Sequence, residues 1–371
     1  MLVAGVPADT FDLQLLAEAI GRSGRGANRR EAMQAAVAQI TAGSSLAQND
    51  ICERLAYALT NPRATDEGVI REMEARSAGF HHLEEIASGL ALMRGITAHL
   101  REITTLLNGA GSEPRSELGR RLISVAGESS VLAGWLASDM GDSATACNFY
   151  DTAMKAAQSA EDPAIAACAL AYRSYVPGIK GNNGRARLLL SEALGMVSET
   201  DSPATVAWIA ARHAEESAAV GDTAQALSSW ARAEEAFSMA DPDEDRVWTR
   251  FLDQDRFESY RIATYSKIGR LDDAQEVASL LLDRMDQSHR KTAAIIFEGI
   301  ATANLARGAV NEASQVAQNG LGILRETGFS MRLPRFEAMA RGLERYQRQP
   351  RVRAYLEEFA MTKRQIAAPS R

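Results

Sequence analysis

Residues 132–163 read LAGWLASDMGDSATACNFYDTAMKAAQSAEDP, and this stretch decides the fold. Two runs of alanine and other helix-forming residues flank Gly141, and Pro163 follows the second run. Alanine has the highest helix propensity, and glycine is common just after a helix because it adopts the left-handed backbone conformation easily. We therefore predict two helices joined by a tight turn at Gly141.

The same pattern recurs after Gly181, Gly221, Gly269 and Gly308. Small or apolar residues stand five, nine and twelve positions after each glycine. In chain order they are Ala146, Tyr150 and Ala153; Ala186, Leu190 and Ala193; Ala226, Trp230 and Ala233; Ala274, Ala278 and Leu281; and Ala313, Ala317 and Gly320. The five glycines are 40, 40, 48 and 39 residues apart, and such regular self-similarity is typical of a helical repeat array.

Each recurring position has a physical role. The alanine at offset five is expected where the two helices cross closely, and the residue at offset nine fills the gap to the next unit. A small residue is also expected seven positions before each glycine. The residues there are Gly134, Ser174, Ala214, Ile262 and Ala301, and only Ile262 is large. Short polar residues near the turns are expected to cap the second helices, namely Asp142, Asn182, Asp222 and Asp272.

The spacing resembles the tetratricopeptide repeat, with longer units. Each helix pair leaves an apolar face that only its neighbour can cover, so the units must stack. We predict an all-α fold, a superhelical array of tetratricopeptide-like antiparallel helix pairs. The longest interval is explained by an insert, DPDEDRVWTRFLDQDRFESYR, at 241–261.

Four segments are predicted along the chain. They are an N-terminal helix and basic linker at 1–30, an irregular helical section at 31–114, five repeats at 115–330, and basic C-terminal capping helices at 331–371. Ahead of the repeats, helices are expected near 9–20, 29–42, 47–60, 66–84 and 86–108, and the first repeat helix near 115–139.

Composition narrows the class of protein. The chain has 371 residues, 46% hydrophobic and 24% charged, and a net charge of −7, which does not fit a protein that coats nucleic acid. Its three cysteines are far apart and form no CxxC motif, so we predict a reducing, cytoplasmic location. The start lacks the pattern of a signal peptide, and no apolar run is long enough for a membrane span.

Several stretches together resemble one family of proteins. They are RLAYALTNPRATDEGVIREMEARSAGFHHLEEI (54–86), GRRLISVAGESSVLAGWLASDMGDSATACNFYDTAMKAAQSAEDP (119–163), AWIAARHAEESAAVGDTAQALSSWARAEEAF (207–237) and VWTRFLDQDRFESYRIATYSKIGRLDDA (247–274). This sequence is similar to the large tetratricopeptide-like region of actinobacterial transcriptional regulators. In that family a helix-turn-helix of the Cro/C1 (XRE) type precedes the array. The likeness covers roughly residues 28 to 330.

The resemblance implies transcriptional control, although the helix-turn-helix itself is absent from this sequence. The opening GVPADTF resembles the last turn of that DNA-binding domain. Two explanations remain open, a chain cut after its DNA-binding domain or a natural stand-alone sensor. DNA would then be reached only through a helix-turn-helix that this chain does not contain, and a homodimer is the expected assembly for such a regulator. The alternative is a stand-alone scaffold for protein–protein interactions without a DNA role.

The concave face of the array is the expected place for a peptide, a small-molecule signal or a protein partner. Inner-face positions are expected thirteen and six residues before each turn glycine. The first set is Glu128, Cys168, Trp208, Arg256 and Ile295; the second is Trp135, Tyr175, Glu215, Ala263 and Thr302. Trp135, Tyr175 and Trp208 are the candidate anchors for such a ligand, and Glu215 and Arg256 the candidate charges that orient it. The alternative is that the aromatic residues only pack between repeats.

A second set of candidates shares one position eight residues before the glycine. It consists of Arg173, His213 and Arg261, in three successive units. This position is normally apolar in the resembled repeat. The polar residues indicate a rotated first helix or a polar channel, or else side chains that reach outward from the edge of the core.

The sequence favours neither a metal site nor catalysis. In FHHLEE (80–85), His81 and His82 diverge by about 100° on a helix, and Glu85 adds only one further ligand. No GxSxG, GxxxxGK[ST] or strand-linked GxGxxG motif is present. We therefore predict a protein that is not an enzyme and needs no cofactor.

The C-terminal segment from Met331 is basic. Ten arginines and lysines face four glutamates there, a local net charge of +6. These helices are expected either to contact DNA phosphates or an acidic partner, or to present solvated arginine-rich faces that cap the array. YLEEF, residues 355–359, is a candidate face for self-association.

Overall fold

The computed structural model describes residues 66–84, 89–109, 116–198, 202–241, 244–284, 290–327 and 332–367. Every regular element in these ranges is a helix, which confirms the predicted all-α class. The described residues do not include the predicted segment 1–30. They also do not include the helices expected near 9–20, 29–42 and 47–60.

The helices follow one another through short connections. The N-terminal group is α4 (Glu67–Leu83), α5 (Gly89–Gly109), α6 (Glu117–Asp139) and α7 (Ser143–Ala160). The central group is α8 (Pro163–Arg173), α9 (Tyr175–Ile179), α10 (Asn183–Leu194), α11 (Pro203–Ala219), α12 (Thr223–Ser238) and the 3₁₀ turn η2 (Val247–Thr249). The C-terminal group is α13 (Gln254–Lys267), α14 (Leu271–Arg284), α15 (Arg290–Ala306), α16 (Val310–Thr327), α17 (Leu333–Leu343), η5 (Glu344–Tyr346) and α18 (Pro350–Ala367). Thus α4, α5 and α6 match three of the predicted helices to within a few residues.

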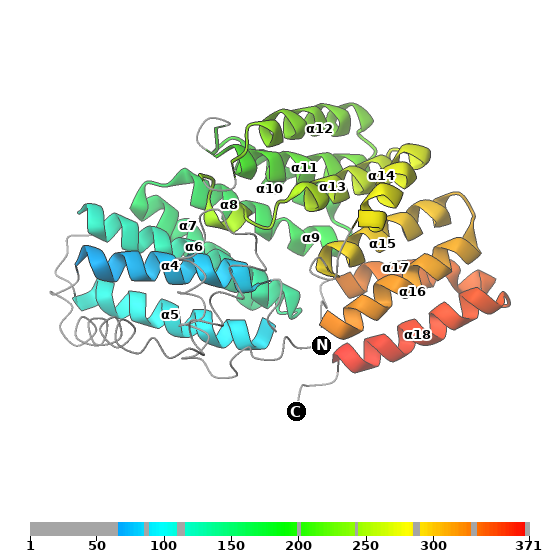
Figure 1. Ribbon diagram of the computed structural model, residues 1–371, viewed down its shortest axis with the longest axis horizontal. Helices are drawn as coiled ribbons and strands as arrows, with labels where there is room; N and C mark the ends of the chain where they lie inside the picture. The colour runs from blue at the N-terminus through cyan, green and yellow to red at the C-terminus, as the bar shows by residue number, and fades with distance from the viewer. Residues whose placement is uncertain are drawn as a thin grey trace.

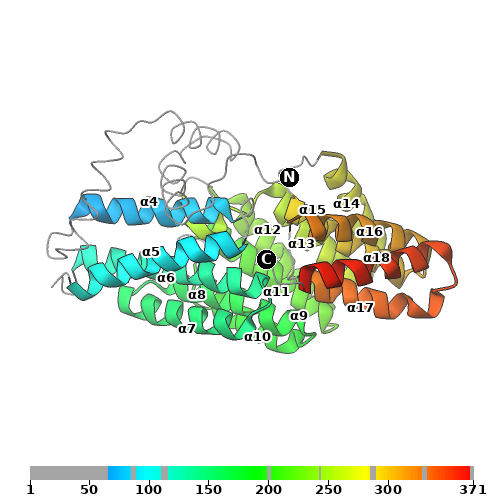
Figure 2. The ribbon, with the colours of Figure 1, turned by 90° about the horizontal axis from the view of Figure 1, so that it is seen from below.

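The helices are arranged in an arch that follows the chain order. Helices α4 and α5 stand at one end, α11 and α12 near the top, and α16 to α18 at the other end (Figure 1). The view from below shows the two ends on opposite sides of α9 to α11 (Figure 2). The first helices of successive pairs, α6, α8, α11, α13 and α15, pack on one another. Each also packs on a second helix, so the arch has an inner layer of first helices.

All five predicted turns share one backbone geometry. The glycines Gly141, Gly181, Gly221, Gly269 and Gly308 have φ between 77° and 85°, the left-handed region that glycine adopts without strain. After each glycine, the next residue donates its N–H to the carbonyl five positions earlier, as Asp142 does to Ala137 at 2.9 Å. This is the hydrogen bond that closes a Schellman motif, and it confirms why glycine recurs at these positions.

Three of the four predicted caps are present. Asp142, Asn182 and Asp222 each accept a hydrogen bond from the backbone N–H three residues later, at 3.0, 3.2 and 3.1 Å. The prediction for Asp272 was wrong. It lies within the first turn of α14, where its carboxylate pairs with Arg307 instead.

Helices of a pair meet through complementary residue sizes. All five alanines at offset five are buried. In the first unit the ring of Tyr150 covers Gly134, and a Cβ on Gly134 would lie 2.4 Å from Cε1 of that ring. In the fourth unit the sizes are exchanged, because buried Ile262 lies in one cluster with Ala278, which stands where Tyr150 stands in the first unit. The exchange explains why Ile262 departs from the small-residue pattern.

The insert folds back onto the helices instead of extending from them. Trp248 is buried and donates its indole N–H to Thr205 Oγ1 on α11 at 3.1 Å. Phe251 packs edge-on against Trp208, with ring centroids 5.4 Å apart. Arg250 reaches His82 at the end of α4, at 2.6 Å. The insert therefore ties α11 to the N-terminal helices.

The candidate self-association face was a wrong prediction. Tyr355 and Phe359 of YLEEF are buried within their own chain, and Tyr355 donates its hydroxyl to the carbonyl of Phe336 at 2.8 Å. Helix α18 packs on α16 and α17 through this face. Many of the C-terminal arginines, including Arg341, Arg345 and Arg353, are exposed.

We predict that Gly134→Ala lowers the free energy of unfolding. The added methyl would overlap the Tyr150 ring, and overpacking costs about 1–3 kcal/mol, more than the roughly 1 kcal/mol that alanine gains in helix propensity. Urea unfolding followed by circular dichroism measures the change. Gly184→Ala on α10 is the matched control, because a Cβ there meets no atom within 4 Å. An equal loss in both variants would contradict the size-matching account.

Candidate functional site

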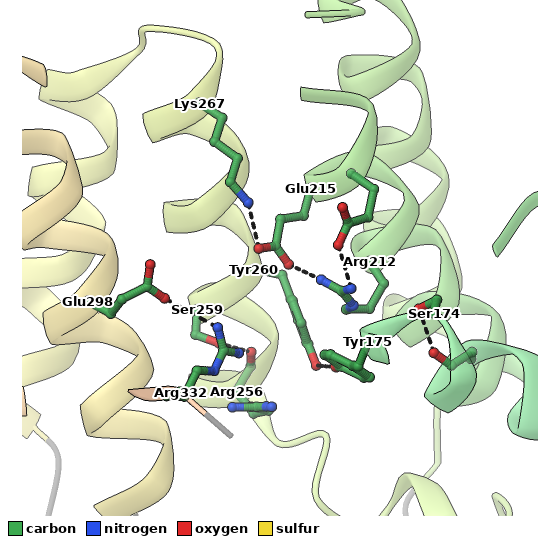
Figure 3. Close-up of polar contacts among 12 residues, drawn as sticks. Ser174, Tyr175, Arg212, Glu215, Arg256, Ser259, Tyr260, Lys267, Glu298 and Arg332 are labelled. Carbon is green, nitrogen blue, oxygen red and sulfur yellow. Dashed lines mark hydrogen bonds and ion pairs between the residues drawn. The ribbon is translucent and has the colours of Figure 1, made fainter. Parts of the chain in front are cut away.

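A cluster of charged side chains lies between α11, α13 and α15 on the inner layer (Figure 3). Arg212, Glu215 and Glu216 are three and four residues apart on α11, so the helix places them on neighbouring positions. Arg212 pairs with Glu215, and its other terminal nitrogen lies 2.6 Å from Glu216 Oε1. Lys267 at the end of α13 places its ammonium 2.6 Å from Glu215 Oε1. The Glu215 carboxylate therefore bridges two helices.

Tyr175 and Tyr260 extend this cluster toward α9. Their hydroxyls are 3.2 Å apart, and the Arg212 guanidinium stacks 4.1 Å from the centre of the Tyr175 ring. Burial raises the pKa of Tyr260, so this phenol stays protonated at neutral pH. The tyrosine pair thus contributes hydrogen-bonding groups without adding charge.

Two further arginines lie beside these groups, Arg332 from the segment before α17 and Arg256 from the first turn of α13. Arg332, just before α17, is buried and lies 3.2 Å from Glu298 on α15. Burial lowers the pKa of Arg332, and the negative charges of Glu298 and Glu215 oppose that shift. The Arg256 guanidinium lies 5.3 Å from the centre of the Tyr260 ring. The cluster thus contains the cations Arg212, Arg256, Lys267 and Arg332 and the carboxylates Glu215, Glu216 and Glu298.

Glu215 remains ionised despite its burial. Burial alone would raise its pKa, but the charges of Lys267 and Arg212 hold the pKa well below its usual range. This is the behaviour of a carboxylate within a paired network, whose charge is compensated by nearby cations.

A narrow cleft opens beside these groups. Its lining includes Glu215, Ala263 and Thr302, which occupy the same repeat position in three successive units, together with Ile295 from the other predicted inner-face position. The cavity volume of the cleft is about 20 Å³, which is room for about one water molecule. The cleft as described is therefore too small for a peptide.

Trp135 belongs to a second inner-face cluster, nearer the N-terminal helices. Its indole N–H donates to Glu84 Oε1 at 2.8 Å. Lys291 on α15 also reaches Glu84 Oε1 at 2.7 Å, and lies 3.8 Å from Asp139. Residues from the ends of α4 and α6 are thereby tied to the start of α15, which is distant in sequence.

Glu128 lies beside this second cluster on α6. Its side chain is 14% exposed, and Arg246 of the insert lies 3.9 Å from it and 2.8 Å from Asp162. Burial raises the pKa of Glu128 to about 7, with Arg246 opposing the shift and Asp162 adding to it. Burial also raises the pKa of the Cys168 thiol, so this cysteine is held in its unreactive protonated form.

Trp208 is in the core and not in an open groove. It is fully buried, with its ring 4.6 Å from that of Tyr172 and in contact with Phe251 of the insert. The insert thus covers the position at which the sequence predicts a ligand anchor. Trp208 packs between repeats, which was the alternative interpretation.

Arg173, His213 and Arg261 do not line the inner face. Arg173 pairs with Asp151 on α7 at 2.6 Å, and Arg261 with Glu234 on α12 at 2.5 Å. The ring nitrogens of His213 lie 2.9 Å from Ser191 Oγ on α10 and 2.8 Å from Ser229 Oγ on α12. All three reach toward the second helices, so the structure does not place them with the candidates on the inner face. Their polarity reflects side chains that extend outward at the core edge.

The histidine pair does not form a metal site in the described part of the chain. His82 contacts Arg250, and burial lowers the pKa of His81 to about 4. Within the described ranges, no group of three or more His, Cys, Asp or Glu residues is placed to hold a metal ion. Among the helices of the same ranges, none has the length and apolar character needed to cross a membrane.

Comparison with known proteins gives no relative for this chain. It matches no family model, no curated protein and no solved structure. The resemblance to transcriptional regulators therefore stays a prediction.

We predict that Lys267→Met lowers the free energy of unfolding by about 3 kcal/mol, because removal of one partner leaves buried charge poorly compensated. Lys363→Met is the matched control, since Lys363 pairs with Glu337 at a solvent-exposed site and should cost less than about 1 kcal/mol. Urea unfolding of both variants measures the difference. Equal losses would mean that the Glu215 network is no more sensitive than a surface ion pair.

A second prediction concerns pH. Because the pKa of Glu128 rises from 4.5 to about 7 on folding, its proton stabilises the folded state below pH 4.5, and this contribution disappears as the pH rises through 7. The full shift corresponds to about 3 kcal/mol. Glu128→Gln has no carboxyl group to titrate at this position. Its free energy of unfolding, relative to that of the unsubstituted protein, should therefore increase from pH 5 to pH 8. Urea unfolding at both pH values tests this, and a constant difference would contradict it.

Proposed function

We propose that this chain is the signal- or partner-sensing region of a transcriptional regulator. In this proposal the five units form a tetratricopeptide-like superhelix, and the ligand is a peptide, a small molecule or a protein held on its inner face. Support for the architecture comes from the common Schellman turn and from the stacking of successive first helices. The regulatory role rests on the family resemblance of the sequence.

The observation that carries the binding proposal is the charge cluster around Glu215. Burying ion pairs is seldom more stabilising than packing apolar residues in the same space. A cluster of four cations and three carboxylates beside a cleft is therefore better explained by recognition than by stability alone.

The described conformation is the closed state in this proposal. The insert covers Trp208, and the cleft beside Glu215 has room for about one water molecule. A ligand would bind a more open conformation and shift the population toward it. Helical arrays can change curvature because each unit contacts mainly its neighbours.

The Lys291–Glu84 contact is a suitable element for such a change. It joins α15 to the end of α4 at 2.7 Å, across the inner side of the arch. Opening the arch would separate these groups, and in a dimer the altered curvature would change the spacing between two DNA-binding heads. The heads themselves would be helix-turn-helix segments outside this sequence.

The proposal predicts a defined set of DNA sites in the source cells. The protein, tagged and expressed from its own gene, is cross-linked to DNA, and the recovered DNA is sequenced alongside the cellular transcripts. We expect enrichment at particular loci and altered transcription of the adjacent genes when the cleft is filled by Thr302→Trp. Thr152→Trp, at an exposed position of α7, is the matched control and should leave transcription unchanged.

The outcomes separate the two functions. If a partner protein is recovered and no DNA locus is enriched, the result would contradict the regulator and favour the interaction scaffold. If DNA loci are enriched but transcription is identical in both tryptophan variants, the result would contradict the role of the cleft in ligand binding.

A further inference from the structure

A second concave site lies on the opposite side of the helix pairs from the charge cluster. It is an open groove of about 640 Å³ between α10 and α12, with α11 beneath it. Arg187 and Ser191 line it from α10, and Ser228, Ser229 and Arg232 line it from α12. His213 of α11 forms part of its floor. The groove does not share any lining residue with the inner-face cleft, so its interpretation is independent of the proposed function.

The floor of the groove is an ordered polar arrangement. Each ring nitrogen of the buried His213 lies within hydrogen-bonding distance of a serine hydroxyl, Ser191 on one side and Ser229 on the other. Gln225 donates its side-chain N–H to Ser229 Oγ at 3.1 Å. The imidazole therefore connects the two walls and holds their hydroxyls at the base of the groove.

The electrostatic environment of His213 is positive. Burial lowers its pKa to about 4, and the charges of Arg187 and Arg232 lower it further, while Asp222 opposes them. Asp222 lies 3.0 Å from Arg187, and both side chains are about a third or more exposed. Two guanidinium groups from facing helices thus act on one neutral imidazole, and the described residues that line the groove include no carboxylate.

The groove also offers apolar contact next to these charges. Leu188 is 58% exposed, and Leu194 is part of the same lining. Arginine pairs favour the oxygens of phosphate groups, and serine hydroxyls and amide N–H groups can complete their hydrogen bonds. An exposed leucine beside such groups suits the organic part of a ligand.

We propose that this groove binds a small organic phosphate, with Arg187 and Arg232 holding the phosphate group above His213 and the leucines contacting the organic part. The serine hydroxyls of both walls and Gln225 supply further hydrogen-bonding groups. An anion placed there would offset the two positive charges next to the imidazole, so occupancy should raise the pKa of His213.

Phenyl phosphate is the probe for the test, and isothermal titration calorimetry measures its affinity for the full chain. We expect saturable binding of one molecule, at least tenfold weakened in Arg232→Met, and weaker binding of inorganic phosphate, which lacks the organic part. Arg185→Met is the matched control, because Arg185 is an exposed arginine of α10 outside the groove lining. Its affinity should equal that of the parent chain.

Nuclear magnetic resonance of the histidine side chains locates the site. The His213 signals, assigned by their loss in His213→Gln, should move on addition of phenyl phosphate, and their titration midpoint should shift upward. Absence of saturable binding would overturn the proposal. So would binding that leaves the His213 signals unchanged, or that Arg232→Met and Arg185→Met affect equally. Equal affinity for inorganic phosphate and phenyl phosphate would overturn the assignment of an organic phosphate as the ligand.

Discussion

The close approach of two helices across each glycine turn is the constraint on which the structure depends. The chain must reverse direction within a few residues, and the left-handed glycine with its Schellman hydrogen bond allows this without strain. The helices can then approach only if one of them is small where they cross. Gly134 under Tyr150 and Ile262 beside Ala278 meet this requirement in opposite ways. What is kept from unit to unit is a small residue on at least one of the two helices at these positions, and not the identity of either residue.

This packing separates the side chains of each first helix into two environments. One side faces neighbouring first helices and carries Glu215, whereas the other reaches the second helices and carries Arg173, His213 and Arg261. Polar residues on the two sides contact different partners. The inner side pairs charges between first helices, and the outer side links a first helix to a second helix. Two polar sites of distinct character therefore arise from one repeated helix pair.

The insert and Lys291 add contacts between parts of the chain that are far apart in sequence. Phe251 of the insert packs edge-on against Trp208, which also contacts Tyr172. Lys291 adds an ionic contact to Glu84 from a helix far along the chain. Such long-range contacts are costly in chain entropy and are made by few residues.

The sequence by itself determined the helical class, the five turns and the small residues where the two helices of a pair meet. These features depend on local backbone geometry and on regular spacing. It also placed Tyr175, Glu215 and Arg256 near one another, since equivalent repeat positions face the same way. The spacing of Arg212, Glu215 and Glu216 within RHAEE was a visible sign of a charged helix face. Only the tertiary structure decided that Lys267, Tyr260 and Arg332 join this face, and that the insert covers Trp208. Those contacts join residues far apart in sequence, and their partners are selected by how the helices pack, which no local pattern encodes.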